Sequence, residues 1–430
     1  MTRLVSFGRS TFASLTQRNF RLFFIGQGIS QVGNWMTLIT QTLLVLSLTN
    51  SGVALGLLAA AQFGPVLLLG PWAGLVADRA DKRKLLMVVQ SVAMVQSLAL
   101  AALVFSGSPP VWSVYALASV GGLTVAFDNP ARRALVVEMV EPRQVTNAVA
   151  LNTTMMTSSR IVGPALGGLL VATTGFGVVF LIDGLSYIAV LASLAMIRSA
   201  ELHKAPVTPR GKGQVRAGLR YIRSEPSLFV PMVVMGIVGT LAFNFTTVLP
   251  LFATRDLGGT DSTYTLLYSV LSVGALVGSL IAARRESVSV ATVGWSAVAF
   301  GTSMLVLAAM PGVASAGVVS VVLGATSVAF LTASTAIVQL RSAPEMRGRV
   351  LAIQAMLFLG STPIGGPIIG WLSEEYGARA GLLVGAVGTL LAGGWGLAVV
   401  GRHRSDGSED RDDIKDDDHL EEFVPSPIAT

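Results

Sequence analysis

Three ionisable side chains lie within or at the edge of long apolar stretches: Asp128, Arg160 and Asp183. A charged group at membrane depth is costly unless it is paired or hydrated, so each is a functional candidate. A buried carboxyl group that titrates near neutral pH can take up and release a proton. Asp183 and Asp128 are therefore candidate proton-coupling residues. The structural alternatives are a hydrogen bond from a neighbouring helix to Asp183, and contact of Asp128 with headgroups or Arg132.

Arg160 stands about midway along its apolar stretch. Arginine stays protonated in proteins, so it can bind an anionic or carbonyl-rich substrate, or it can pair with an acid. On ideal helix geometry Arg160 and Asp183 differ in depth by about 11 Å, which argues against a direct pair between them.

Polar side chains at helical spacing form a stripe in the first apolar stretch and another in the seventh. The stripes are Gln27, Gln31, Asn34 and Gln41, and then Thr240, Asn244 and Thr247. Lipid penalises such stripes, so we expect both to line one water-filled path that holds substrate. Hydrogen bonding between helices is the alternative. Candidate aromatic walls of this path, or ordinary packing residues, are Tyr268, Phe358, Phe243 and Phe245.

Several kinds of chemistry are excluded by the residues present. The chain has no cysteine, and its histidines, His203, His403 and His419, lie outside the apolar stretches. It contains no phosphate-binding loop, zinc-binding H-E-x-x-H helix or nucleophile elbow. We therefore expect no cofactor, no metal, no nucleic-acid partner and no enzymatic activity, since an intramembrane enzyme would need a nucleophile and a base at depth.

The composition is that of a membrane protein. Of 430 residues, 52% are apolar and 13% are charged, about half the charged share of a soluble protein. Helical crossing of a bilayer takes about 20 apolar residues. Twelve such stretches predict an all-α polytopic membrane protein, with spans at 22–48, 53–77, 85–105, 111–128, 145–173, 177–197, 229–253, 264–283, 288–310, 314–338, 350–372 and 379–400.

The basic residues alternate between the connections. All but three of the 30 Lys and Arg residues lie on connections of one side; Arg255 and Arg379 lie on the other, and Arg160 lies within a span. This bias predicts that both termini are cytoplasmic. No cleavable signal peptide is apparent, so we expect a multi-pass protein of the cytoplasmic membrane.

The two halves of the chain repeat each other. Gly163 to Gly167 in the fifth span matches Gly366 to Gly370 in the eleventh, and Gly74 matches Gly278 at nearly the same offset. This predicts two pseudo-symmetric six-helix bundles, as in secondary transporters. The expected parts are a cytoplasmic arm (1–21), the first bundle (22–197), a cytoplasmic linker (198–228), the second bundle (229–400) and an acidic, disordered cytoplasmic tail (401–430).

The sequence also resembles the major facilitator superfamily. Residues Gly74, Asp78, Arg79, Lys82 and Arg83 fit its signature between spans 2 and 3, with Asp81 in place of a later glycine. The resemblance implies that this segment latches the cytoplasmic side in the outward-open state; the alternative is that its basic residues only set topology. Ala282 stands where a second Asp78 would align, so a latch would be one-sided.

The fifth span is similar to the family's antiporter pattern. The matching residues are Gly163, Pro164, Gly167 and Gly168, near Arg160, with Ser159 at the first glycine position. Segments 128–132 and 147–152 resemble the branch that contains enterobactin exporters and macrolide efflux proteins, as do 18–21 and 344–349. The glycines permit close helix contact, and antiport is implied by the family alone.

These features predict a secondary transporter that exports small amphipathic molecules of drug, macrolide or siderophore type, giving efflux and multidrug resistance; the family resemblance implies that it is a monomer. Proton antiport with alternating access is the expected mechanism, with the lipid bilayer, protons and a small-molecule substrate as partners. The alternatives left open are uptake, lipid or siderophore movement by the same fold, and a membrane sensor that binds ligand without moving it.

Overall fold

The computed structural model describes residues 12–203, 214–282 and 288–405. These residues are helical, with no strand among them, and twelve helices are long and apolar enough to cross a membrane. A backbone surrounded by lipid must satisfy its hydrogen bonds within the segment, which the helix does. The prediction of an all-α protein with twelve spanning helices is confirmed.

The first bundle contains six uninterrupted helices. They are α2 (Arg18–Thr49), α3 (Gly52–Arg79), α4 (Lys82–Phe105), α5 (Val111–Glu138), α6 (Val145–Thr174) and α7 (Phe176–Ala195). Side-chain caps mark two of the starts. Ser51 accepts a hydrogen bond from the Ala54 N–H (3.2 Å), and Asp81 accepts one from the Lys84 N–H (3.1 Å). Such caps satisfy backbone donors that the first turn leaves free.

The fourth helix is longer than its predicted span. The sequence places Asp128 at the end of that span, whereas α5 continues to Glu138. This expectation is wrong because Arg132 and Glu138, the buried charged residues beyond Asp128, are paired within the protein. Arg132 pairs with Asp128 (2.9 Å), and Glu138 pairs with Lys82 of α4 (3.1 Å). Asp128 therefore lies inside the helix, ten residues before its last residue.

The second bundle contains four continuous helices and two broken ones. The continuous helices are α11 (Asp261–Ala282), α12 (Val290–Ala308), α13 (Val313–Arg341) and α16 (Ala378–Ser405). The seventh span consists of α9 (Pro226–Leu241), α10 (Phe245–Leu251) and a π-helical turn, and the eleventh of α14 (Pro344–Leu359) and α15 (Thr362–Glu375). Neither break was expected from the sequence, which reads as one apolar stretch in each case.

Local chemistry explains both breaks. The side-chain amide of Asn244 donates to the Thr240 carbonyl (2.7 Å), where the backbone N–H of residue 244 would bond in a continuous helix. Pro363 has no N–H for the Leu359 carbonyl, so α14 ends there. The two breaks lie next to each other. A side chain added at Gly365, just after the second break, would collide with the Thr240 carbonyl, just before the first.

The predicted linker contains a short helix, α8 (Gln214–Ser224). It packs against α14, where the Tyr221 hydroxyl accepts a hydrogen bond from the Ala343 N–H (3.0 Å). Residues 204–213 of the linker lie outside the described residues, as do 1–11 of the predicted arm and 406–430 of the predicted disordered tail.

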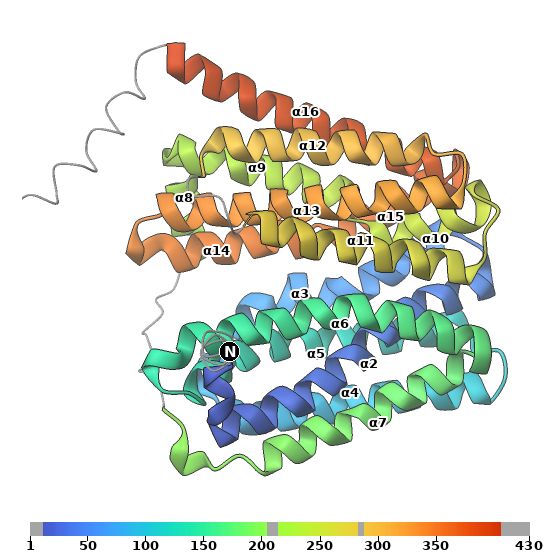
Figure 1. Ribbon diagram of the computed structural model, residues 1–430, viewed down its shortest axis with the longest axis vertical. Coiled ribbons are helices and arrows are strands. Elements are labelled where there is room, and N and C mark those ends of the chain that lie inside the picture. The colour runs from blue at the N-terminus through green and yellow to red at the C-terminus, as the bar shows by residue number, and fades with distance from the viewer. Residues whose placement is uncertain (1–11, 204–213, 283–287, 406–430) are drawn as a thin grey trace, which may run out of the picture.

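The two bundles lie side by side and meet mainly through two helix pairs, α3 with α15 and α6 with α11, with smaller contacts of α10 and α14 against α3 (Figure 1). Glycines make these contacts close. A Cβ atom added at Gly56 would lie 2.5 Å from the Gly366 carbonyl oxygen, and one at Gly52 would lie 2.5 Å from that of Gly370. A Cβ atom at Gly168 would overlap Thr265. We call this end of the bundles the closed end.

The contact does not continue to the other end of α3, which carries Arg79. Leu67 still touches Gly360, but a Cβ atom added at Gly64 or Gly70 would meet no atom within 4 Å. The helix ends on this side also carry Lys82, Arg198 and Arg341, and we call it the open end. The bundles are thus joined at one end and separate toward the other.

Gly56→Ala tests the seal. The added methyl group meets backbone atoms, and overpacking of this kind costs about 1–3 kcal/mol. The closed end should therefore open more often, by about tenfold per 1.4 kcal/mol. A reporter cysteine at position 265, in this cysteine-free chain, would measure opening as the rate of labelling by a membrane-impermeant maleimide. Gly64→Ala, on the same helix with open space around it, should leave the rate unchanged; equal rates in both variants would contradict the assignment of the seal.

Candidate functional site

Asp183 lies at the junction of three helices of the first bundle. It is on α7, is 1% exposed, and faces α2 and α4. Its Oδ2 atom accepts hydrogen bonds from Thr37 on α2 (2.7 Å) and Ser97 on α4 (2.8 Å). Among the described residues, no cation pairs with this carboxyl group, and its Oδ1 atom has no hydrogen-bond partner. The neighbouring hydroxyl groups therefore satisfy only one of the two carboxyl oxygens of Asp183.

Gly33 makes room for this carboxyl group. A Cβ atom on Gly33 would overlap Asp183 Oδ1 and would lie 2.8 Å from the Ser186 hydroxyl oxygen. The absence of a side chain at this position lets the carboxyl group rest against the backbone of α2. Burial of an acid here thus depends on a glycine of a different helix.

Asp128 lies at a separate cavity inside the first bundle. It accepts a hydrogen bond from Gln90 of α4 (2.7 Å) and pairs with Arg132, which also binds the Asn129 side-chain oxygen (2.7 Å). The cavity has room for about one ordered water molecule. It is lined by Gln27, Ser30, Gln31, Asn34, Val89, Gln90, Ala93, Thr124, Val125, Asp128 and Tyr187.

The polar stripe of the first span is divided by this arrangement. Gln27, Gln31 and Asn34 face the cavity with Asp128, and every residue that lines it belongs to the first bundle. Gln41 instead accepts a hydrogen bond from Gln62 of α3 (2.7 Å), both being buried. The expectation was that these amides face one path shared by the two bundles, whereas the structure places them between helices of one bundle.

The residues singled out in the second bundle lie around the break in the seventh span. Asn244 and Thr247 are buried, and Asn244 Oδ1 and Thr247 Oγ1 have no hydrogen-bond partner among the described residues. Thr240 donates to the Gly236 carbonyl (2.7 Å). Phe243 packs edge-on against Phe358, with ring centroids 4.9 Å apart. Tyr268 is buried against Tyr264, and Phe245 is buried near Phe300.

Two basic residues of the signature between the second and third spans make contacts within the first bundle. Lys82 pairs with Glu138, and Arg83 donates to the carbonyls of Leu194 (2.7 Å) and Ala195 (2.8 Å) at the end of α7. Gly74 and Asp78 are half-buried on α3, and Arg79 is exposed. In this conformation Lys82 and Arg83 tie together the open ends of α4, α5 and α7.

Two of the segments that resemble the efflux branch make similar ties. The Asn19 side chain donates to the Arg198 carbonyl and accepts from the Arg198 N–H, both at 3.1 Å. The Asn147 side chain accepts from the N–H (3.0 Å) and the hydroxyl (2.7 Å) of Ser14. Asn147 thus joins the segment before α2 to α6, and Asn19 joins the start of α2 to the segment after α7.

The glycine-rich part of α6 serves two contacts. Gly163 lies against Trp35 and Val32 of α2, and Gly167 lies against Met36, so both glycines pack within the first bundle. Gly168 meets Thr265 of α11 and belongs to the seal between the bundles. Pro164 is buried, and Arg160, one turn earlier, lies over the Trp35 ring at 5.4 Å from its centroid.

Sequence reasoning missed a polar clasp at the closed end. Glu374 of α15 accepts hydrogen bonds from the Ser51 hydroxyl (2.5 Å) and the Val53 N–H (2.8 Å) of the first bundle. Arg255 of the second bundle donates to the Asn50 carbonyl. The two partners of each contact are far apart in the chain, so the sequence gives no direct indication that they meet. The only available clue was that each lies at the end of a predicted span.

Two joined six-helix bundles with a seal at one end define a membrane transporter of the major facilitator type. Residues 9–422 match the family described as "Transmembrane secretion effector", and the chain belongs to this family. The solved structures that it resembles include a peptide transporter (TM-score 0.75, 10% identity, 90% of this chain and 95% of that one). A bacterial homologue of the human lysosomal transporter Spinster, in an inward-facing conformation, is also similar (TM-score 0.71, 12% identity, 89% and 96%).

Curated relatives are distant. The staphyloferrin A transporter of Staphylococcus aureus is 25% identical over 60% of this chain, and the match spans 64% of that protein, less than two thirds of it. Macrolide efflux protein A of Streptococcus pyogenes is 21% identical over 86% of this chain and 93% of its own length. The multidrug efflux pump Tap of Mycolicibacterium fortuitum is 24% identical over 84% and 90%.

Gly33→Ala tests the packing around Asp183. Its methyl group would overlap the carboxyl oxygen, so we expect a loss of about 1–3 kcal/mol in stability. The measurement is the thermal unfolding midpoint of the purified protein. Gly28→Ala is a matched control on the same helix, because a Cβ atom there makes an ordinary contact with Met155 Sδ (3.5 Å). An unchanged midpoint in Gly33→Ala would show that the carboxyl group does not need this space.

Proposed function

We propose that this protein exports small amphipathic molecules across the cytoplasmic membrane by alternating access, driven by proton antiport. The observation that carries the proposal is the pair of bundles sealed at one end and separated toward the other. Two bodies joined in this way can rock against each other and open the opposite side. One chain supplies both bundles and the seal, so the proposed transporter works as a monomer.

The distribution of basic residues supports the direction. The helix ends at the open end carry Arg79, Lys82, Arg198 and Arg341, while Arg255 and Arg379 lie at the closed end. Basic connections remain on the cytoplasmic side. The described conformation would therefore be inward-open, ready to take up a solute from the cytoplasm, with both termini on that side.

The substrate class follows from the relatives and from the interior. Relatives named for macrolide efflux, multidrug efflux and staphyloferrin A transport support an amphipathic solute. The charged residues of the second bundle lie near the ends of its helices rather than in their middle, and aromatic rings gather at the break in its seventh span. An interior of this kind suits bulky solutes of mixed polarity better than highly charged ones.

Asp183 is the first candidate for proton coupling. It lies within a span, and no ion pair fixes its charge among the described residues. Thr37 and Ser97 link it to two other helices, so gain or loss of a proton would change how α2, α4 and α7 hold together. Asp128, the second candidate, faces a cavity but already has Arg132 as a partner.

The signature residues at the open end fit a second part of the cycle. Lys82 and Arg83 hold helix ends of one bundle in this inward-open form. In the outward-open form, the bundles approach at this end, and we propose that Asp78 and Arg79 then contact the second bundle and latch it.

The test uses inside-out membrane vesicles that contain a pH-sensitive dye and carry an imposed proton gradient. Lipophilic antibiotics and siderophores are added in turn. We expect at least one compound to collapse the gradient, and vesicles without the protein to show no change. Absence of any response from correctly folded protein would contradict proton-coupled export of these classes.

Asp183→Asn should abolish substrate-dependent proton movement, because an amide cannot carry the proton while it keeps the size of the side chain. The same vesicles report the effect, and Asp128→Asn separates the two candidates. If Asp183→Asn retains active efflux together with its pH dependence, Asp183 is not the coupling residue.

A further inference from the structure

Arg160 places a positive charge deep within the membrane-spanning region. It lies about 22 Å along α6, near the middle of that helix. Its guanidinium group stacks over Trp35, and its Nε atom is buried with no hydrogen-bond partner among the described residues. A charge at this depth is costly unless something compensates it, and a single aromatic face supplies only part of that compensation.

The described residues offer Arg160 no acidic partner. Asp128 is paired with Arg132, and the described acidic residues of the second bundle lie at helix ends, away from the depth of Arg160. Asp183 contacts α2 at Gly33 and Thr37, which share one face of that helix. Trp35 lies between them in sequence and so points to the other side. Helix α2 therefore stands between Arg160 and Asp183.

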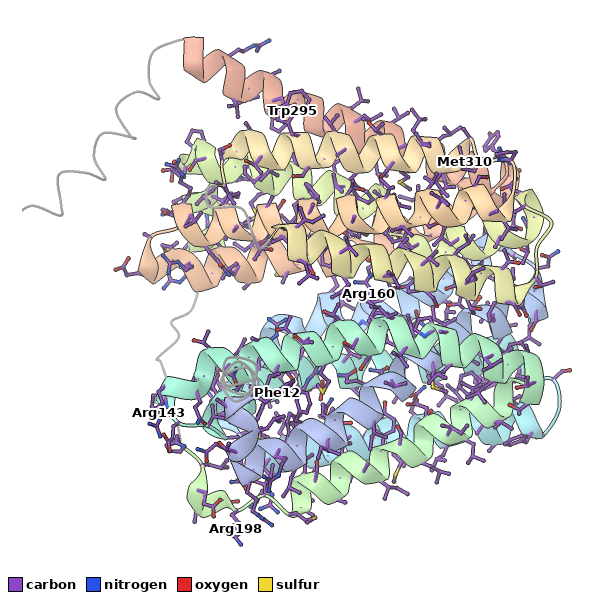
Figure 2. The ribbon with its side chains drawn as sticks, in the orientation of Figure 1. Phe12, Arg143, Arg160, Arg198, Trp295 and Met310 are labelled. Carbon is purple, nitrogen blue, oxygen red and sulfur yellow. The ribbon has the colours of Figure 1, made fainter. Side chains whose placement is uncertain are left out.

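Arg160 lies on the open-end side of the seal between the bundles. Gly168, which meets Thr265 across the bundles, is eight residues nearer the closed end, or about 12 Å along α6. Figure 2 shows Arg160 at the boundary between the two bundles. A solute that enters between the bundles from the open end would reach Arg160 just before the seal stops it.

We propose that Arg160 and Trp35 form an anion-binding anchor in the transport path, which selects amphipathic substrates that carry a carboxylate or similar anionic group. The guanidinium group would bind the anion through paired N–H donors. The Trp35 ring, held by the close contact of Gly163 with α2, keeps that group in place. This proposal rests on the proposed export function and narrows its substrate class: anions are favoured, and cationic amphiphiles are disfavoured.

The test compares probes that differ in charge. Purified protein in phosphatidylcholine nanodiscs is titrated with dansyl-phenylalanine, its uncharged methyl ester and the cationic dansylcadaverine, and fluorescence gives each Kd. We expect the acid to bind about tenfold more tightly than the ester, as one charge-assisted contact would give, and dansylcadaverine to bind most weakly. Arg160→Gln should reduce the difference between acid and ester to about twofold or less.

The controls separate this role from a structural one. Arg341→Gln removes an exposed arginine, changes the net charge equally and should keep the full preference for the acid. Arg160→Lys keeps the charge without the planar group, so a reduced preference should remain; it also decides the matter if Arg160→Gln does not fold. No preference in the wild-type protein, or an undiminished one in a folded Arg160 variant, would overturn the proposal.

Binding and transport distinguish this proposal from the export proposal. Preference for the acid that depends on Arg160, without movement of any probe in vesicles, would support the anchor and contradict export. Proton-coupled transport that is indifferent to probe charge would support export and contradict the anchor.

Discussion

Close backbone contact between helices is the constraint on which this architecture depends. Helices in lipid gain little from hiding apolar side chains, so association relies on packing at small residues. Gly52 and Gly56 of α3 meet Gly366 and Gly370 of α15 at such contacts, and a Cβ atom added at Gly52, Gly56 or Gly370 would collide with a backbone oxygen of the facing helix. Because the fit ends near Leu67, the bundles separate beyond it. One set of glycines thus determines both the seal and the opening.

The second constraint is the cost of charge in an apolar interior. Asp183, Asp128 and Arg160 meet it in three ways: with hydroxyl groups from two helices, with an adjacent arginine, and with an aromatic face. The arginine gives Asp128 a direct charge partner, whereas Asp183 keeps one carboxyl oxygen without a hydrogen-bond partner among the described residues. The aromatic face leaves Arg160 with a full positive charge about 12 Å along α6 from the seal, which is the reason for treating it separately from the acids.

The sequence predicts the fold well because long apolar stretches and the basic bias are local properties. The breaks in the seventh and eleventh spans were not predicted from the sequence. They depend on the side-chain amide donor of Asn244 and on the backbone N–H that Pro363 lacks, single residues within otherwise apolar stretches. The site is harder. Residues of one polar stripe, such as Gln31 and Gln41, turn to different neighbours because partners on α3, α4 and α5 decide where an amide points. The clasp of Ser51 and Glu374 depends on contacts distant in sequence.

Contacts within and between the bundles differ in kind, and this difference fits the proposed rocking motion. Inside the first bundle, Asp183, Thr37 and Ser97 are buried and hydrogen-bonded to one another. Breaking these hydrogen bonds would leave a buried polar group without a partner, which is costly. Between the bundles, Glu374 and Arg255 make exposed contacts that water can replace at small cost. The glycine contacts between α3 and α15 are close, but separating these helices leaves no buried charge without a partner. Each bundle is therefore expected to move as a rigid body, with the closed end as the part that yields.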